Sequence, residues 1–256
     1  MGFRMLLALC LALGLSAQAP RRVTVAAAAD LKWALEEVRR DFAKDHPGVQ
    51  VEVTFGSSGQ FYAQLTQKAP FDLFLSADLD YARKLQDAGL GHGLFTYATG
   101  RLALIVPAGS PLDLSGLGLR ALLEPGIQHV AMANPAHAPY GRAAQAALAA
   151  AGLTAQVQPK LVLGENVAQA AQYVHSGAAQ AGLVALSLAL APELSGRIRT
   201  WVVPAKLHPP LEQGGVILAW AREPEAAEAF RAFLAGPRGA AILARYGFEA
   251  PGRATK

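Results

Sequence analysis

The chain has 256 residues, of which 52% are hydrophobic, and its formal net charge is +4 at pH 7. This length suffices for one large domain or two small ones. The excess of positive charge is mild, and no basic cluster appears beyond Arg39 and Arg40. Because a nucleic-acid binder needs a basic face against the phosphates, these values argue against that class of protein.

An export signal is the first predicted element and spans residues 1–19. Arg4 precedes a short apolar run, and a small-x-small cleavage pattern ends the segment. Pro20 would become the first mature residue, which disfavours cleavage at that bond, so nearby cleavage or retention as an anchor stays open. Cys10 leaves with the signal, and the mature chain then has no cysteine for a disulfide or a thiolate metal site. We therefore expect a periplasmic or other extracytoplasmic protein.

Short apolar runs alternate with helical patterns in the first part of the mature chain. Residues 23–28, 49–55 and 73–75 have the continuous or alternating apolar pattern of strands. Each of these runs is followed by apolar residues at helical spacing. Strands that alternate with helices indicate right-handed crossovers and a mostly parallel sheet.

A second series of the same kind follows a continuous apolar run at residues 102–106. Its strands are predicted at 130–133, 161–163 and 183–185, and each is associated with a helical pattern. An apolar strand at 216–220 and two closing helices complete the chain.

This order of elements predicts an α/β protein of two lobes joined by two extended strands. Lobe 1 is expected to comprise residues 20–104 and 214–256, and lobe 2 residues 105–213. We expect a hinge near residues 102–106 and 213–216, about which the lobes close on a ligand. A single doubly wound domain is the alternative.

Four junctions share one character: a strand ends, a small or polar residue follows, and a helix begins. Ligands of open α/β sheets bind outside the carboxyl ends of the strands, where such junctions converge. Two junctions from each lobe would surround a small anion with helix N-termini, backbone N–H groups and hydroxyls such as those of Ser57 and Ser58. No Lys or Arg is then needed, although each junction alone is an ordinary helix cap. The junctions are residues 28–30, 56–59, 134–141 and 164–167.

Seven segments together carry a resemblance to a known family: 26–31, 56–64, 69–78, 134–141, 164–167, 182–185 and 236–247. In this order they resemble the periplasmic molybdate-binding proteins of ABC importers over essentially the whole mature length. The resemblance implies a type II periplasmic-binding fold with a mixed, mostly parallel sheet in each lobe and the ligand cleft between them. It also implies that molybdate or tungstate is held by neutral donors and delivered to a membrane permease. We expect a monomer without a cofactor.

The resemblance assigns ligand contacts by position. Ser58 would give a hydroxyl and a backbone N–H, and Val167 a backbone N–H. Tyr140 matches a position that is tyrosine in part of the family, and we expect its hydroxyl to bond the anion. Ala185 matches a position where some members have a tyrosine, so it offers little beyond shape. No free metal cation is expected.

Asp30 departs from the family pattern, because many relatives have a hydroxyl or amide residue at that position. A carboxylate beside a divalent oxyanion costs on the order of 1 kcal/mol in water at 4 Å and several times more in a partly dry cleft. We favour an Asp30 side chain that turns aside to cap the helix at Leu31, since Asp caps well. The alternatives are a protonated carboxyl that donates, or a different ligand, either another oxyanion or a metal ion. Ala29 and Ser57 complete the predicted ligand-binding set.

An enzyme is the alternative of another class, in the form of a serine-dependent hydrolase or transferase. The sequence has no H-E-x-x-H, G-x-S-x-G, S-x-x-K or phosphate-loop motif, and its histidines lack metal-ligand spacing. A nucleophilic Ser58 would need a histidine within hydrogen-bond reach, which the order of the chain does not suggest. His137 lies in one of the four junctions, where a surface position is expected. We therefore predict a binding protein and not an enzyme.

Overall fold

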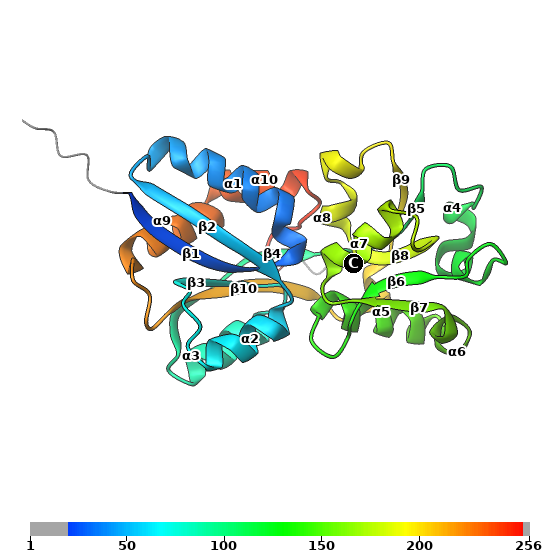
Figure 1. Ribbon diagram of the computed structural model, residues 1–256, viewed down its shortest axis with the longest axis horizontal. Coiled ribbons are helices and arrows are strands. Elements are labelled where there is room, and N and C mark those ends of the chain that lie inside the picture. The colour runs from blue at the N-terminus through cyan, green and yellow to red at the C-terminus, as the bar shows by residue number, and fades with distance from the viewer. Residues whose placement is uncertain (1–19, 253–256) are drawn as a thin grey trace, which may run out of the picture.

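The computed structural model describes residues 20–252, so the predicted signal at 1–19 lies outside the described residues. Two five-stranded sheets, each covered by helices, lie side by side as two lobes (Figure 1). The α/β class and the two-lobed arrangement are confirmed. Within the described part of the chain, no helix is both long and apolar enough to cross a membrane.

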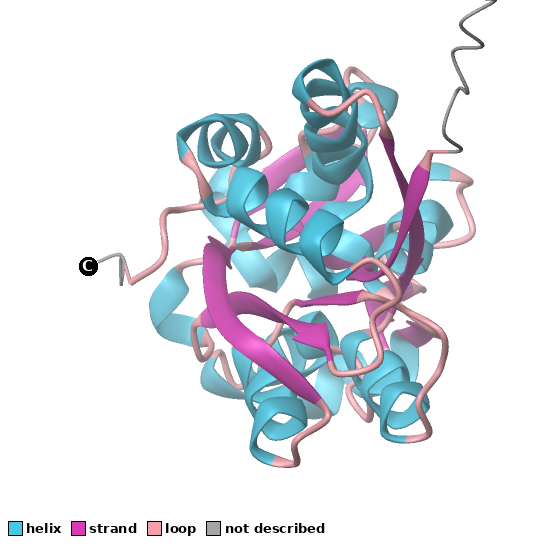
Figure 2. Ribbon diagram, turned by 90° about the vertical axis from the view of Figure 1, so that its left-hand side faces the viewer, coloured by secondary structure: helices cyan, strands magenta, loops and turns pink. Residues whose placement is uncertain are grey.

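Lobe 1 is built on a sheet with the strand order β2-β1-β3-β10-β4. The central β1 pairs in parallel with β2 and β3, while β10 pairs antiparallel with β3 and β4. Helices lie on both sides of these strands (Figure 2). The strands are β1 (Arg21–Ala28), β2 (Val49–Gly56), β3 (Leu73–Ser76), β4 (Gly91–Gly100) and β10 (Leu211–Leu218). The helices are η1 (Ala29–Leu31), α1 (Lys32–Asp45), α2 (Ser58–Thr66), α3 (Leu79–Asp87), α9 (Pro224–Ala235) and α10 (Pro237–Arg245).

Lobe 2 repeats this plan with the strand order β7-β6-β8-β5-β9. Two parallel pairings around β6 are joined to two antiparallel pairings around β5. The strands are β5 (Leu102–Pro107), β6 (Val130–Ala133), β7 (Leu161–Gly164), β8 (Ala181–Ala185) and β9 (Ile198–Val202). The helices are α4 (Leu114–Leu117), η2 (Gly118–Leu123), α5 (Pro139–Ala150), α6 (Thr154–Val157), η3 (Gln158–Lys160), α7 (Val167–His175), α8 (Leu186–Ala189), η4 (Pro192–Leu194) and η5 (Ala205–Leu207).

Apolar periodicity explains how the helices attach to the sheets. Helix α1 buries Ala34, Leu35, Val38 and Phe42, which recur at three- and four-residue spacing and form one stripe. That stripe joins the apolar core of lobe 1, to which β1 also contributes. The carboxyl ends of the parallel strands are thereby fixed at the edge of the sheet that faces the other lobe.

The chain crosses between the lobes twice. It leaves lobe 1 at Arg101, between β4 and β5, and returns between β9 and β10. Both crossings lie a few residues before the boundaries predicted at 104 and 213. The Arg101 side chain forms an ion pair of 2.5 Å with Glu249, whose backbone pairs with that of Thr99, so the C-terminal segment supports the first crossing.

The two lobes are closed on each other. Ala28, Ala29 and Ala77 of lobe 1 are each 2% exposed and belong to the same buried apolar cluster as the core of lobe 2. Burial of these small side chains brings the ends of β1 and β3 against the helices of the opposite lobe. The residues at the four predicted junctions therefore meet in one place.

Candidate functional site

A small cavity lies where four helix N-termini meet, two from each lobe. It has a volume of about 10 Å³, close to the space of one water-sized sphere. Among the described residues that line it, none is Lys or Arg, and the one carboxyl belongs to Asp30. The lining residues are Ala28, Ala29, Asp30, Gly56, Ser57, Ser58, Ala77, Ala138, Pro139, Tyr140, Asn166 and Val167.

Six of the seven predicted site residues line this cavity: Ala29, Asp30, Ser57, Ser58, Tyr140 and Val167. Ala185 does not line it. It is fully buried at the end of β8, directly before α8. The α8 residue Ser187 instead donates from its hydroxyl to the carbonyl oxygen of Asp30 at 2.7 Å, which ties lobe 2 to the start of η1.

The first turn of α7 leaves one backbone donor for a ligand. The Asn166 side chain caps the helix by accepting from the N–H groups of Ala168 and Gln169, at 3.0 and 3.1 Å. The N–H of Val167 precedes these two and has no intrahelical partner, because it belongs to the first residue of the helix. Val167 lines the cavity, so this N–H belongs to a residue of its wall.

The first turns of α5 and α2 add further donors. Helix α5 begins with Pro139, which has no N–H. No side chain caps this helix, so the N–H of Tyr140 is not bonded to a capping group. At α2 the Ser58 hydroxyl accepts from the N–H of Ala77 at 3.0 Å and keeps its own proton to donate. Aligned peptide dipoles also make each helix N-terminus partially positive. The lining is therefore rich in uncharged donors.

Asp30 is almost fully buried, with 1% of its surface exposed. Its Oδ2 accepts from the Nε2 of Gln213 on β10, while its Oδ1 has no partner among the described residues. Burial raises the pKa of this carboxyl from 3.8 to about 6, against the lowering effect of hydrogen bonds from Gln213 and Tyr140. Asp30 therefore holds a proton more readily than an ordinary carboxyl.

The favoured interpretation of Asp30 as a helix cap is wrong. The Asp30 Oδ2 accepts from Gln213 and its Oδ1 has no hydrogen-bond partner among the described residues, so the carboxyl caps no helix N–H. The carboxyl turns to Gln213 and Tyr140, and the N–H groups of Asp30 and Leu31 are the smallest contributors to its pKa. Gln213, which is 183 residues away along the chain, therefore determines the orientation of the Asp30 carboxyl, in spite of the local preference of Asp for helix caps.

The Tyr140 hydroxyl also points to this carboxyl, where the sequence predicted a contact with the anion. It accepts from the Nε2 of Gln213 at 3.3 Å. Burial, together with the charge of Asp30, holds the pKa of Tyr140 well above its usual value. Gly100 of β4 makes room for this contact, because a Cβ there would overlap the Tyr140 hydroxyl oxygen. We call Asp30, Tyr140 and Gln213 the Asp30 cluster.

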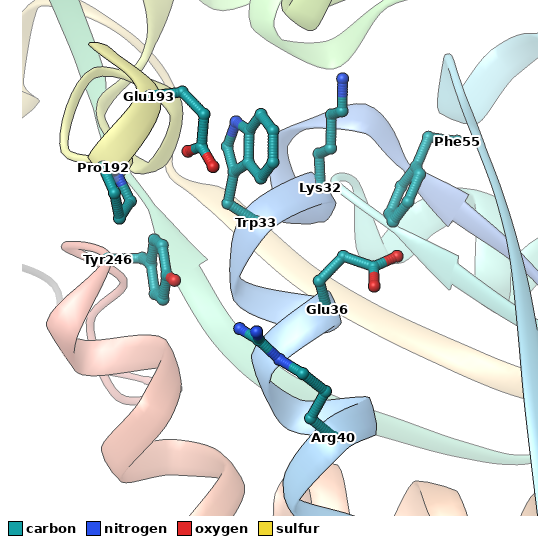
Figure 3. A pocket seen from close by; sticks show the side chains of 8 residues that line it. All are labelled: Lys32, Trp33, Glu36, Arg40, Phe55, Pro192, Glu193 and Tyr246. Atoms are coloured by element: carbon teal, nitrogen blue, oxygen red, sulfur yellow. The ribbon is translucent and has the colours of Figure 1, made fainter. Parts of the chain in front are cut away.

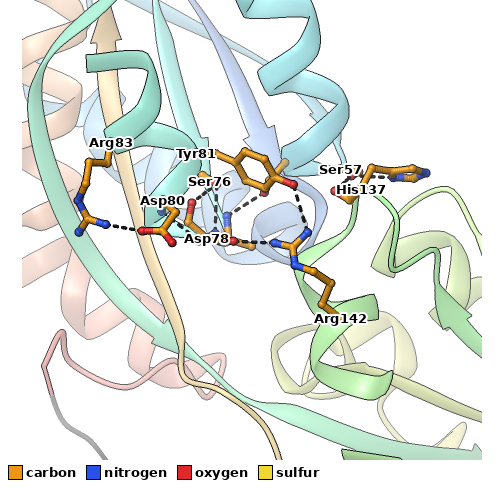
Figure 4. Close-up of polar contacts among 10 residues, drawn as sticks. Ser57, Ser76, Asp78, Asp80, Tyr81, Arg83, His137 and Arg142 are labelled. Carbon is orange, nitrogen blue, oxygen red and sulfur yellow. Dashed lines mark hydrogen bonds and ion pairs between the residues drawn. The ribbon is translucent and has the colours of Figure 1, made fainter. Parts of the chain in front are cut away.

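A histidine does lie beside a serine of the site, but the serine is Ser57 and not Ser58 (Figure 4). The His137 Nδ1 is 3.0 Å from the Ser57 Oγ, which itself donates to the carbonyl oxygen of His137 at 2.6 Å. Because the serine proton is directed at the carbonyl, the ring nitrogen acts as the donor and does not remove that proton. The pair therefore joins two loops across the lobes and does not form a nucleophile with its base.

Arg142 of α5 makes the other prominent contact between the lobes (Figure 4). Its guanidinium bonds the Oδ2 of Asp78 at 2.6 Å and the hydroxyl of Tyr81 at 3.1 Å, and its Cζ lies 5.4 Å from the centre of the Tyr81 ring. Asp78 also caps α3, because its Oδ1 accepts from the N–H of Asp80 at 3.0 Å. No local pattern connects it to Arg142, 64 residues further on. We call Arg142, Asp78 and Tyr81 the Arg142 clasp.

A wider groove of about 390 Å³ runs along α1 and η4 outside the cavity (Figure 3). Lys32, Arg40, Glu36 and Glu193 all line it, so charges of both signs are mixed. The ammonium group of Lys32 lies over the Trp33 ring at 4.8 Å. This groove does not have the uncharged donors of the cavity.

The metal-ion alternative for Asp30 lacks a ligand set. Across residues 20–252, no group of three or more His, Cys, Asp or Glu side chains is close enough to hold a metal ion. Gln213 and Tyr140 are the side chains that contact the Asp30 carboxyl, and they are uncharged.

Comparison with known proteins places the chain beside transport proteins. The family described as bacterial extracellular solute-binding protein matches residues 23–249. The molybdate-binding protein ModA of Rhodobacter capsulatus is 36% identical over 244 residues, 94% of each chain. ModA of Azotobacter vinelandii is 38% identical over 229 residues, which are 88% of this chain and 89% of that one.

A solved structure agrees with these sequences. The Azotobacter vinelandii periplasmic molybdate-binding protein matches with a TM-score of 0.82 and 34% sequence identity. The match covers 90% of this chain and 99% of that chain.

Proposed function

This chain belongs to the bacterial extracellular solute-binding proteins, and from that membership we propose that it captures molybdate between its lobes for an ABC importer. The predicted type II two-lobed fold is confirmed by the match over 99% of the Azotobacter structure. The relatives are binding proteins of a transport system, so the serine-enzyme alternative is not supported. The chain binds its ligand and does no chemistry on it.

The observation that carries the proposal is the cavity at four helix N-termini without a basic residue. Backbone N–H groups and hydroxyls at helix starts hold a dehydrated anion well, because they are donors fixed by the fold and need no counter-charge. A tetrahedral dianion can accept from several of them at once. Two of the helix starts come from each lobe, so a bound anion would hold the lobes together.

We assign the donors as follows. Ser58 supplies its hydroxyl and its N–H, and Val167 and Tyr140 supply backbone N–H groups. Ala29 and Ser57 shape the wall, since the Ser57 hydroxyl is engaged with His137. Ala185 lies outside the lining and has no place in this donor set.

Selectivity would follow from the fixed spacing of the donors. A ring of rigid donors fits one anion radius well. Tungstate matches molybdate in charge and shape and would therefore also bind. Sulfate would be rejected because it is too small. We infer from the importer context that the protein acts outside the cytoplasm, as a monomer that meets a membrane permease. Residues 1–19 would direct its export.

The test is isothermal titration of the purified, ligand-stripped protein with molybdate, tungstate, sulfate and phosphate in one buffer. Tight one-to-one binding of the first two, with no heat from the others, is the expected result. Absence of molybdate binding would overturn the proposal.

Val167→Pro removes one proposed donor at a helix position that tolerates proline, and Asn166 before it already has the extended conformation that proline requires. We expect this variant to bind molybdate at least about tenfold more weakly, in line with the loss of a hydrogen bond to a charged group. Val167→Ala is the matched control, because it shortens the same side chain and keeps the N–H.

A further inference from the structure

Asp30 is an acidic group in the wall of a proposed anion site, and the fold gives it no positive partner. It is 1% exposed, and the carboxyl contacts Gln213 from β10 and Tyr140 from α5. Tyr97 of β4 is the other titratable group coupled to it, and α8 contributes the uncharged Ser187. None of the groups that shift its pKa is Lys, Arg or His. A dianion in the cavity would therefore meet this carboxyl without any cation between them.

The two carboxyl oxygens of Asp30 have different surroundings. Oδ2 accepts from Gln213 and is held in place as an acceptor. Oδ1 is buried and has no hydrogen-bond partner among the described residues, although Asp30 lines the cavity. A buried polar atom without a partner is costly, and a proton on Oδ1 that is donated to an anion oxygen would satisfy it.

We propose that Asp30 is protonated in the anion-loaded protein, so that the chain takes up one proton from solvent with each molybdate dianion it binds. The proton resides on Oδ1 and is donated to an oxygen of the anion, while Oδ2 continues to accept from Gln213. The carboxyl then acts as one more uncharged donor in the ring. This inference rests on the proposed function. It adds that the binding of molybdate is coupled to the uptake of one proton.

The electrostatics of the site agree with this assignment. Burial raises the pKa of Asp30 to about 6 even though its hydrogen bonds lower it, and a dianion beside it raises the pKa further. Near pH 7 the carboxyl of the empty protein is largely ionised, and that of the loaded protein carries its proton. Affinity must then fall as the pH rises, by about tenfold per pH unit when one full proton is taken up.

The experiment is titration of the purified protein with molybdate near pH 7 in buffers of different ionisation enthalpy, which yields the number of protons taken up. Close to one proton per molybdate is expected. Asp30→Asn places an amide donor where the protonated carboxyl would be, and it should bind molybdate with almost no proton uptake and an affinity independent of pH. His137→Gln is the control for the histidine beside the cavity wall and should leave the uptake unchanged.

Molybdate binding without proton uptake in the wild type would overturn the inference and leave the proposed function intact. Uptake that persists in Asp30→Asn would also overturn it. Absence of molybdate binding at every pH would overturn the proposed function and the inference together. Infrared difference spectra of the wild type give a second readout that needs no variant, because a protonated-carboxyl band should appear when molybdate is added, and its absence would refute the proposal.

Discussion

The Asp30 cluster and the Arg142 clasp both join lobe 1 to lobe 2, and they do so by opposite means. The clasp is a complete ion pair in which the side chains of Arg142 and Asp78 remain 38% and 31% exposed. The cluster has a single ionisable carboxyl, no cation, and almost no exposure to water. Water screens the ion pair of the Arg142 clasp but does not reach the Asp30 cluster. We therefore expect the cluster to contribute more than the clasp to the free energy of lobe closure.

Stability against pH gives the largest expected effect. The pKa of Asp30 is about 6 in the folded protein and has an ordinary value of 3.8. The folded state therefore holds this proton more tightly than the unfolded state, and ionised Asp30 costs stability as the pH rises from about 4 through 6. The full difference corresponds to about 3 kcal/mol.

Asp30→Asn should remove this cost. We expect the variant to have a higher free energy of unfolding than the wild type at about pH 8, with the difference shrinking below pH 6 and vanishing near pH 4. Chemical denaturation of both proteins across this range measures it. Equal stability at all pH values would contradict the burial of Asp30 in the ligand-free protein.

Gly100→Ala tests the packing of the same cluster. The new Cβ would overlap the Tyr140 hydroxyl and approach the Nε2 of Gln213 within 2.7 Å. Overpacking of a buried contact typically costs 1–3 kcal/mol, so we expect molybdate affinity to fall by about thirtyfold because the lobes cannot close fully. The affinity is measured by titration calorimetry.

Gly48→Ala is the matched control, since nothing lies within 4 Å of its added Cβ. It should bind molybdate like the wild type. An unchanged affinity in Gly100→Ala would mean that Tyr140 moves aside at no cost.

The sequence predicted the parts of the site that depend on local patterns. Strand and helix periodicity located the four junctions, and the parallel pairing of their strands makes the junctions converge, so residues such as Ser58 and Val167 could be assigned to one cavity. The Asp30 cluster could not be found in this way. Gln213 is a polar residue in a buried strand, and its contact with Asp30 spans 183 residues, so no spacing in the sequence connects the two.

Local propensity was also misleading at Asp30. Asp is among the preferred residues at helix starts, and this favoured a cap. The tertiary structure instead supplied a buried amide donor and excluded water, and these set both the orientation of the carboxyl and its pKa. The Arg142 clasp could not be predicted from the sequence either, because its residues lie in different lobes.

Tyr140→Phe separates two roles for the hydroxyl. If the hydroxyl accepts from Gln213 and lies against the Asp30 carboxyl, its loss should weaken molybdate binding by about 1 kcal/mol, the net value of one hydrogen bond. It should also raise the pKa of Asp30, because the Tyr140 bond lowers it. The pH dependence of molybdate binding should therefore move to higher pH. A loss of 1–3 kcal/mol with an unmoved pH profile would indicate that the hydroxyl bonds the anion itself.

The smallest effect is expected at the Arg142 clasp. Arg142→Gln removes the ion pair with Asp78, and partly exposed pairs of this kind contribute about 0–1 kcal/mol. Molybdate affinity should therefore fall by less than about fivefold, and the loss should shrink further as salt is added, because exposed charges are screened. Arg231→Gln is the matched control, since it breaks an ion pair with Glu228 that lies within α9 of lobe 1 and does not cross between lobes. If Arg142→Gln weakened binding more than Gly100→Ala does, the exposed clasp and not the buried cluster would dominate closure.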